Sequence, residues 1–205
     1  QSRLWENNVG RSLEFWKYNY ESLKLVFPNQ LSNVTVDDFY KAANNVKPSL
    51  IRTNADELTY HLHVLIRYEI EKALIEGKIK VKDLPKIWNL KYHEYLDLEV
   101  PSDDMGVLQD IHWSHGSFGY FPTYTIGSFY AAQFFNQAKI ENPNLLQEIE
   151  DGNNKNLLNW LRKNIHKNGK RLDANKLCKK ISGEELNFKY FKQYVIKKYS
   201  KIYNL

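Results

Sequence analysis

One short stretch of the sequence gathers the side chains best suited to chemistry. Residues 101–130 read PSDDMGVLQDIHWSHGSFGYFPTYTIGSFY and contain four glycines, two prolines and two histidines among several aromatic rings. Glycine and proline at this density do not continue a helix. Aromatic walls with a few polar groups are typical of a pocket for a small ligand or a peptide, although composition alone equally supports a buried loop whose polar side chains satisfy the backbone. The polar side chains of this stretch are Gln109, Asp110, His112, Ser114, His115, Tyr120 and Tyr124.

The spacing of the histidines argues against a metal site. His61 and His63 are two residues apart in a helical pattern, so their side chains point to different sides and are surface or core residues rather than ligands. His112 and His115 are three apart and would share a metal only on a helix, which the glycines that follow disfavour. We therefore expect no intact zinc site in this chain.

Helices are the elements that must position these residues. In the clearest of them, from about Asp56 to Glu76, apolar residues recur at three- and four-residue steps and predict one buried face. Thr53 followed by Asp56 resembles a capping box, and Gly77 stands where a left-handed cap belongs. The apolar residues of that face are Leu58, Leu62, Leu65, Ile66, Ile70, Ala73 and Leu74.

Helical patterns also cover most of the rest of the chain. We expect helices over residues 13–27, 37–44, 127–139, 144–150, 156–166 and 188–203, with another that starts at Asp83 and Pro85. Asn187 is positioned to cap the last of these. No alternating strand pattern, repeat or flexible linker is present, so the sequence predicts an all-α fold with a single helical body over residues 1–205.

Composition and charge exclude several classes of protein. With 205 residues, of which 42% are hydrophobic, the chain has enough apolar side chains for a globular core. The single cysteine, Cys178, cannot form an internal disulfide, and no apolar run is long enough to span a membrane. The net charge of +5 is uneven, because residues 139–205 hold 15 Lys and Arg against 7 Asp and Glu. Lysines spread over amphipathic helices are more often a solvated surface than a nucleic-acid site.

The order of residues in the central stretch resembles a known family. Residues 106–113, GVLQDIHW, have the form G-x-x-Q-D-x-H-W and are followed by GYFPTY at 119–124 and YAAQ at 130–133. The same series occurs in the Taq-type (thermostable) zinc metallocarboxypeptidases. IRTNAD at 51–56 is similar to the I/V-R-x-x-A-D motif of that family, and QSRLWEN at 1–7 is similar to the segment that follows its third zinc ligand. The resemblance covers the whole chain, which it identifies as the carboxyl-terminal half of such a protein.

The resemblance implies half of a larger helical metallopeptidase with a central cleft. Family members bind a divalent metal, usually zinc, through an H-E-x-x-H helix and a glutamate from an H-E-S-like segment, neither of which is in this sequence. That glutamate would stand two positions before Gln1, so we expect the chain to be part of a longer protein. We expect zinc or another divalent metal in the full-length parent and none bound to this chain.

Substrate-binding roles are also implied by the resemblance. A carboxypeptidase must recognise a free carboxylate, and an arginine is a permanently charged, two-pronged donor for that group. Arg52, in the I/V-R-x-x-A-D match, is the candidate, and a structural ion pair with Asp56 is the alternative reading. Gln109 and Asp110 are expected to line the substrate pocket, with Asp110 orienting His112 by a hydrogen bond.

Three candidate catalytic residues follow from the same motifs. Tyr120 and Tyr124 are each able to donate a hydrogen bond to the carbonyl oxygen of the substrate as it becomes an oxyanion, and the sequence does not choose between them. His112 completes the set.

The expected partner is a peptide with a free carboxyl terminus. The resemblance further implies a homodimer of the full-length protein, and the composition favours the cytoplasm, without a nucleic-acid or membrane partner. Two alternatives remain: a non-catalytic helical binding module or split-gene subunit, and a basic nucleic-acid binder.

Overall fold

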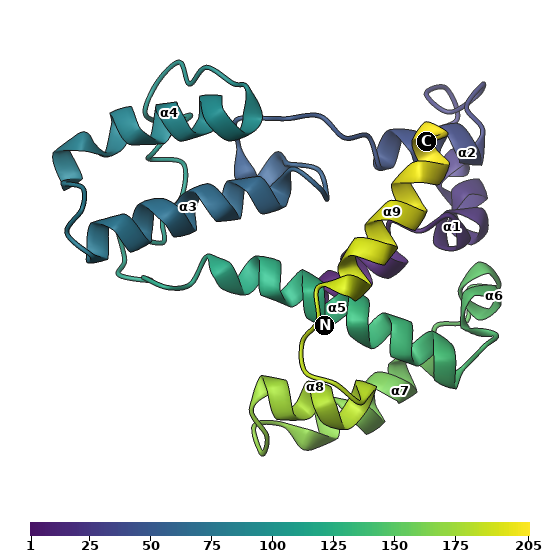
Figure 1. Cartoon of the computed structure of the whole chain (residues 1–205). Helices are drawn as coiled ribbons and strands as arrows, with labels where there is room; N and C mark the ends of the chain where they lie inside the picture. The colour runs from purple at the N-terminus through teal and green to yellow at the C-terminus, as the bar shows by residue number, and fades with distance from the viewer. The chain divides into compact units, whose positions relative to one another are not determined.

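The computed structural model describes all residues 1–205, and every regular element in it is a helix, as predicted (Figure 1). The chain divides into two compact units. We call Gln1–Ala43 with Gly127–Leu205 the terminal unit and Asn44–Ile126 the central unit.

The terminal unit contains most of the helices. A π-helical turn at Leu4–Val9 precedes the first of them, and α1 packs against α2 and α6. The helices of this unit are α1 (Leu13–Val26), α2 (Val36–Ala43), the larger part of α5 (Pro122–Glu141), α6 (Leu145–Glu150), α7 (Lys155–Asn164), α8 (Ala174–Ser182) and α9 (Lys189–Tyr203). Their apolar faces meet in one core that includes Leu4, Val9, Ala131, Phe135, Leu145, Ile149, Leu157 and Leu161.

Side-chain caps explain where several of these helices begin. Ser12 Oγ accepts a hydrogen bond from Phe15 N at 3.2 Å at the start of α1. The predicted cap Asn187 lies one residue before the cap position of α9, which is Phe188, and its Oδ1 accepts a hydrogen bond from Lys189 N at 3.0 Å. The sequence analysis did not assign α8, which Asp173 caps at its start by a 2.8 Å hydrogen bond from Lys176 N.

The central unit is built on two helices that lie side by side (Figure 1). They are α3 (Tyr60–Ile75) and α4 (Leu84–Leu96), with 3₁₀ turns at Arg52–Asn54 and Val81–Asp83. Trp88 and Tyr92 of α4 pack in a core with Ile66 and Ile70 of α3. Residues 97–121 form turns and no helix, as predicted for most of the glycine-rich stretch 101–130, whose last nine residues lie in α5.

The start of α3 differs from the prediction. It begins at Tyr60 and not near Asp56, because the Asp56 carboxylate caps a preceding turn through Leu58 N at 2.8 Å and Thr59 N at 2.9 Å. Thr53 lies in a 3₁₀ turn and is not the cap. The predicted end is confirmed, since Gly77 has a φ of 69° and its N–H donates to Leu74 O at 3.0 Å.

Two other predictions need correction, one about the exposure of Leu65 and one about the start of α5. Leu65 is predicted on the buried face of α3 but is 37% exposed, because the buried residues Ile66, Arg67, Ile70 and Glu71 centre on the opposite side of the helix. The helix predicted to start at Gly127 begins five residues earlier at Pro122, where the missing N–H of proline costs nothing because first-turn N–H groups have no intrahelical partner.

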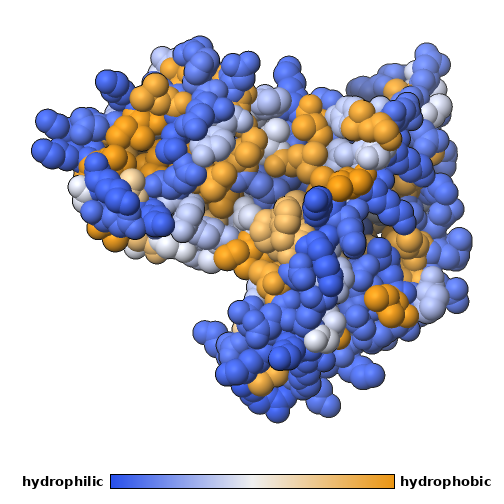
Figure 2. Space-filling model, in the orientation of Figure 1, coloured by the Kyte–Doolittle hydropathy of each residue, from blue (hydrophilic) through white to orange (hydrophobic).

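The surface of the chain mixes polar and apolar side chains (Figure 2). Hydrophobic atoms gather on the visible face over α4, and the exposed large apolar residues of this part of the chain include Ile75, Val81 and Leu90. No helix is both long and apolar enough to cross a membrane.

Candidate functional site

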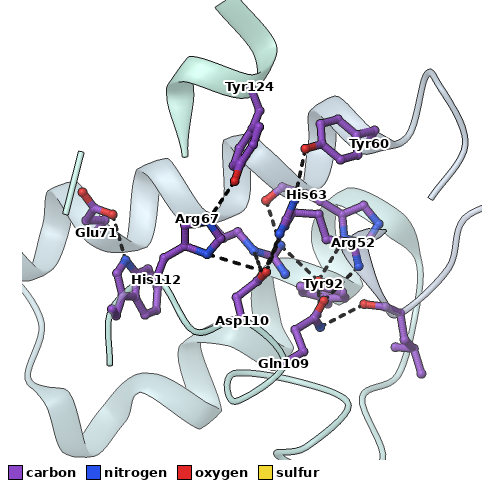
Figure 3. Close-up of polar contacts among 12 residues, drawn as sticks. Arg52, Tyr60, His63, Arg67, Glu71, Tyr92, Gln109, Asp110, His112 and Tyr124 are labelled. Carbon is purple, nitrogen blue, oxygen red and sulfur yellow. Dashed lines mark hydrogen bonds and ion pairs between the residues drawn. The ribbon is translucent and has the colours of Figure 1, made fainter. Parts of the chain in front are cut away.

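A carboxylate shared by two arginines lies at the centre of the candidate site in the central unit (Figure 3). Asp110 Oδ1 lies 2.6 Å from Arg52 Nη2 and 3.1 Å from Arg52 Nε. Its other oxygen, Oδ2, lies 2.6 Å from Arg67 Nε. The three side chains are 8% (Arg52), 10% (Asp110) and 0% (Arg67) exposed, so both ion pairs are shielded from water and held by charge-assisted hydrogen bonds.

Ionisation of Asp110 is maintained by these arginines. Burial alone would raise the pKa of this carboxyl group, but the hydrogen bonds from Arg52 and the charge of Arg67 outweigh burial and lower the pKa. Asp110 is therefore negatively charged near neutral pH. The ion pair of Arg52 is with Asp110 and not with Asp56, which binds backbone N–H groups instead.

Arg52 is fixed by further contacts on both of its sides. Its Nη1 donates to Tyr60 Oη at 3.0 Å, and its guanidinium lies over the ring of Tyr124 with the centroid at 5.1 Å. Its backbone N–H donates to Gln109 Oε1 at 2.9 Å. The Gln109 amide nitrogen in turn donates to Leu50 O at 3.0 Å. Gln109 thus ties the glycine-rich stretch to the segment that carries Arg52, and these contacts of Gln109 are with the backbone.

His112 and Tyr124 form the second part of the site. The two residues are joined by a 3.0 Å hydrogen bond between His112 Nε2 and Tyr124 Oη (Figure 3). Burial, opposed by Asp110, lowers the pKa of His112, so the ring is neutral near pH 7. The expected hydrogen bond from His112 to Asp110 is not formed, because 3.9 Å separates Nδ1 from Asp110 Oδ1, a distance too long for such a bond.

Tyr120 stands beside this pair on the more open side. Its ring centroid lies 5.6 Å from that of His112 and 5.3 Å from that of Tyr124, and the residue is 49% exposed. The structure therefore brings all six predicted site residues into one region of the central unit.

Helix α3 supplies site residues that the sequence analysis did not single out. Tyr60, His63, Arg67 and Glu71 follow one another at three- and four-residue steps and are all buried, so one face of the helix is lined with polar groups. The spacing that puts positions 60, 63, 67 and 71 on one face of the helix is visible in the sequence. The apolar spacing of this helix predicts core residues instead.

Glu71 anchors the glycine-rich loop onto α3. Its carboxylate accepts hydrogen bonds from Trp113 Nε1 at 2.8 Å and from the backbone N–H of Gly119. Gly119 has a φ of 75°, in the left-handed region that glycine adopts without a steric penalty. The loop can therefore turn at Gly119 and direct its N–H at the carboxylate, which holds the segment that carries His112 and Tyr120.

His63 is buried within α3, as expected of a core residue. Its Nδ1 lies 3.0 Å from Tyr92 Oη, and Arg67 Nη1 donates to the same hydroxyl at 3.2 Å. Burial and the charge of Arg67 lower the pKa of His63 to about 3, so it is neutral near pH 7. His61 lies on another side of the helix and contacts Thr125 Oγ1 at 3.0 Å.

Comparison with known proteins identifies the family. Residues 1–199 match the model of the carboxypeptidase Taq (M32) metallopeptidases. The chain belongs to the M32 family. It is 43% identical over 205 residues to carboxypeptidase 1 of Bacillus subtilis and 44% identical over 203 residues to thermostable carboxypeptidase 1 of Thermus thermophilus. These matches cover 100% and 99% of the chain but 41% and 40% of the relatives, so the chain spans about two fifths of their length.

Solved structures of M32 proteins have the same fold. An M32 carboxypeptidase from Deinococcus radiodurans R1 superposes with a TM-score of 0.96 at 42% identity, over 100% of this chain and 41% of its own. Metallocarboxypeptidase 1 of Trypanosoma cruzi superposes with a TM-score of 0.91 at 36% identity, over 97% of this chain and 42% of its own. The all-α fold predicted from the helical patterns of the sequence is confirmed.

An M32 metallopeptidase implies a divalent metal, and the residues of this chain do not provide a site for one. No group of three His, Cys, Asp or Glu side chains is placed to hold a metal ion. His112 and His115 have their ring centroids 6.1 Å apart and lie in turns rather than on a helix. No step of chemistry at this site is therefore assigned to a metal.

Proposed function

We propose that this chain is the carboxyl-terminal part of the catalytic domain of a metal-dependent carboxypeptidase, and that its central unit binds the free carboxylate of the peptide. The observation that carries the proposal is the buried cluster of Arg52, Asp110 and Arg67 beside His112 and Tyr124. Two guanidinium groups share one carboxylate there, so the cluster attracts a second anion. Membership of the M32 family and relatives named carboxypeptidases agree with that anion being a peptide terminus.

Arg52 is the residue that contacts the substrate in this proposal. Its hydrogen bonds to Asp110 and Tyr60 use one N–H on each terminal nitrogen, and we assign the remaining N–H groups to the substrate carboxylate. Asp110 and Tyr60 hold the guanidinium in one plane before the peptide arrives. Such pre-organisation reduces the entropy lost when the peptide binds.

Arg67 is a positioning residue. Its side chain is fully buried, so it does not contact the peptide. It donates instead to Asp110 Oδ2, whereas the shortest hydrogen bond of Arg52 is to Oδ1. Removal of Arg67 would leave Asp110 bound to Arg52 alone. We expect Arg52 then to be more fully neutralised and to bind a substrate carboxylate more weakly.

His112, Tyr120 and Tyr124 face the reacting carbonyl in this proposal. Burial raises the pKa of Tyr124, which keeps its hydroxyl protonated and able to donate. The negative charge of Asp110, 3.9 Å from His112 Nδ1, favours the tautomer with its proton on that nitrogen, so Tyr124 donates to Nε2 when no substrate is present. We propose that a tyrosine hydroxyl donates to the oxyanion as it forms, and that Gln109 and Asp110 shape the pocket.

We further propose that the metal is zinc, bound by residues outside this chain, and that the full-length protein is a cytoplasmic homodimer. The first part is tested by assaying this chain for bound metal and for release of carboxyl-terminal residues from a blocked dipeptide. We expect neither from the chain alone and both from the full-length protein. Stoichiometric metal or robust cleavage by this chain alone would contradict the proposal, and activity only after a separate metal-binding chain is added would identify a split enzyme.

A further inference from the structure

A cavity that is not part of the candidate site lies within the terminal unit. It has a volume of about 360 Å³ and is enclosed by the start of α1 and by helices α5 and α9. A cavity of this size falls within the range of small-molecule sites. It is lined by four lysines and a single acidic residue, Glu14, which leaves it strongly positive.

The four lysines converge from two helices. Lys197, Lys198 and Lys201 follow one another at short steps on one side of α9, and Lys139 faces them from α5. Burial and the charge of Lys197 lower the pKa of Lys139, so the charge of Lys139 is costly in the absence of an anion. Lys139, Lys197 and Lys201 take part in none of the ion pairs of the chain.

Hydrogen-bonding and apolar groups complete the wall. Tyr194 accepts a hydrogen bond from Lys198 Nζ at 3.1 Å and donates to Asn7 O at 3.1 Å, which fixes one corner of the cavity. Apolar surface comes from Phe135 and Leu146. A ligand here would meet ammonium groups from both helices together with aromatic and aliphatic surface.

We propose that this cavity binds a small molecule that carries a phosphate group. Lysine acts on phosphate as a compact point charge, whereas a site for a planar carboxylate favours the two-pronged arginine, and the cavity contains no arginine. Four lysines against Glu14 give a formal surplus of three positive charges, enough to neutralise a phosphate group, which carries about two negative charges near neutral pH. Inorganic phosphate and an organic phosphate monoester share this chemistry.

Calorimetric titration of the chain at physiological ionic strength tests the proposal, with phenyl phosphate and inorganic phosphate as probes. We expect saturable binding of one molecule per chain. Tighter binding of phenyl phosphate than of inorganic phosphate would assign the cavity to an organic monoester, and equal binding would assign it to free phosphate. The absence of saturable binding by both probes would overturn the proposal.

Two variants locate the binding. Lys139→Gln and Lys197→Gln each remove one charge from the wall and should weaken binding about tenfold or more, the typical effect of losing a charged hydrogen bond. Lys163→Gln is the matched control, because Lys163 lines a different basic hollow formed by α7 and α8. Equal weakening by all three variants would mean attraction by net charge alone and would overturn the assignment. Unchanged helical content by circular dichroism confirms that the variants fold.

Discussion

Arg67 Nε lies 2.6 Å from Asp110 Oδ2, although Arg67 is on helix α3 and Asp110 is in the glycine-rich stretch 43 residues later. Both side chains are largely hidden from water. The bond links helix α3 to the turns of residues 97–121. Asp110 also pairs with Arg52, so Arg67 and Arg52 are held by the same carboxylate. The geometry of Arg52 therefore depends on a residue that does not meet solvent.

Asp110→Asn should destabilise the folded chain strongly. The change removes the only charge that neutralises Arg52 and Arg67 in the described contacts, and the loss of one partner from a buried ion pair costs about 3–5 kcal/mol. Urea unfolding followed by circular dichroism measures the change in the free energy of unfolding. Lys176→Gln breaks an exposed ion pair with Asp173 and should give no measurable change. Equal stability of Asp110→Asn and the unmodified chain would show that the cluster does not hold the fold.

His63 should make the stability of the chain depend on pH. Its pKa is about 3 in the folded chain because of burial and the charge of Arg67, against an ordinary value of 6.5. The unfolded chain takes up a proton on this residue below pH 6.5 and the folded chain does not, so this contribution to stability is complete above 6.5 and is lost as the pH falls. The slope from this residue is at most about 1.4 kcal/mol per pH unit.

Comparison with His63→Gln isolates this effect, because glutamine can keep a hydrogen bond to Tyr92 but does not titrate. Urea unfolding from about pH 8 down to about pH 5 should show a shallower decline for the variant. Parallel curves for the two proteins would show that His63 becomes protonated in the folded state as readily as in the unfolded state.

Gly119→Ala should destabilise the loop that holds His112 and Tyr120. No atom lies within 4 Å of the added methyl group, so the cost comes from the φ of 75° and is about 1–2 kcal/mol. Gly127→Ala is the matched control, since Gly127 lies inside α5 with open space around it and should gain roughly 0.5–1 kcal/mol. If both substitutions changed the free energy of unfolding in the same direction, the positive φ at Gly119 would not be the cause.

Local patterns in the sequence predicted much of the fold because helix ends have local causes. The hydrogen bond from Lys189 N to Asn187 Oδ1 and the left-handed Gly77 depend on neighbours within a few residues. The predicted start of α3 was wrong because the Asp56 carboxylate caps the turn before the helix. The local sequence is equally compatible with a cap on that turn and a cap on the helix. Residue spacing alone does not show which of these two elements Asp56 caps.

The sequence predicted some residues of the candidate site and not others. Motifs in the sequence indicated Arg52 and Asp110, and the structure joins them across 58 residues. Arg67 was not predicted because a charged residue inside an apolar helix is usually at the surface. Its burial depends on Asp110, which is distant in sequence, and no pattern within α3 reports that partner.

Replacing Tyr120 and replacing Tyr124 should have different effects on kcat in the full-length enzyme that we propose. Tyr124 is hydrogen-bonded to His112, whereas Tyr120 is half exposed beside it. Replacement by phenylalanine of the tyrosine that donates to the oxyanion should lower kcat by about a hundredfold or more with little change in KM. We expect the other phenylalanine variant to retain kcat within about tenfold. Retention of full turnover by both variants would remove both tyrosines from the mechanism.

The role of Arg52 is the central claim, and steady-state kinetics of Arg52→Ala in the full-length enzyme test it most directly. Arg67 continues to pair with Asp110 in this variant, so the loss of Arg52 does not leave that carboxylate without a partner. We predict that kcat/KM for a peptide with a free carboxyl terminus falls at least about tenfold to a hundredfold, since a charge-assisted hydrogen bond to substrate is lost. Lys176→Gln should leave this value unchanged. If Arg52→Ala retained the full kcat/KM, Arg52 would be a structural residue and the assignment of the substrate carboxylate to this cluster would be wrong.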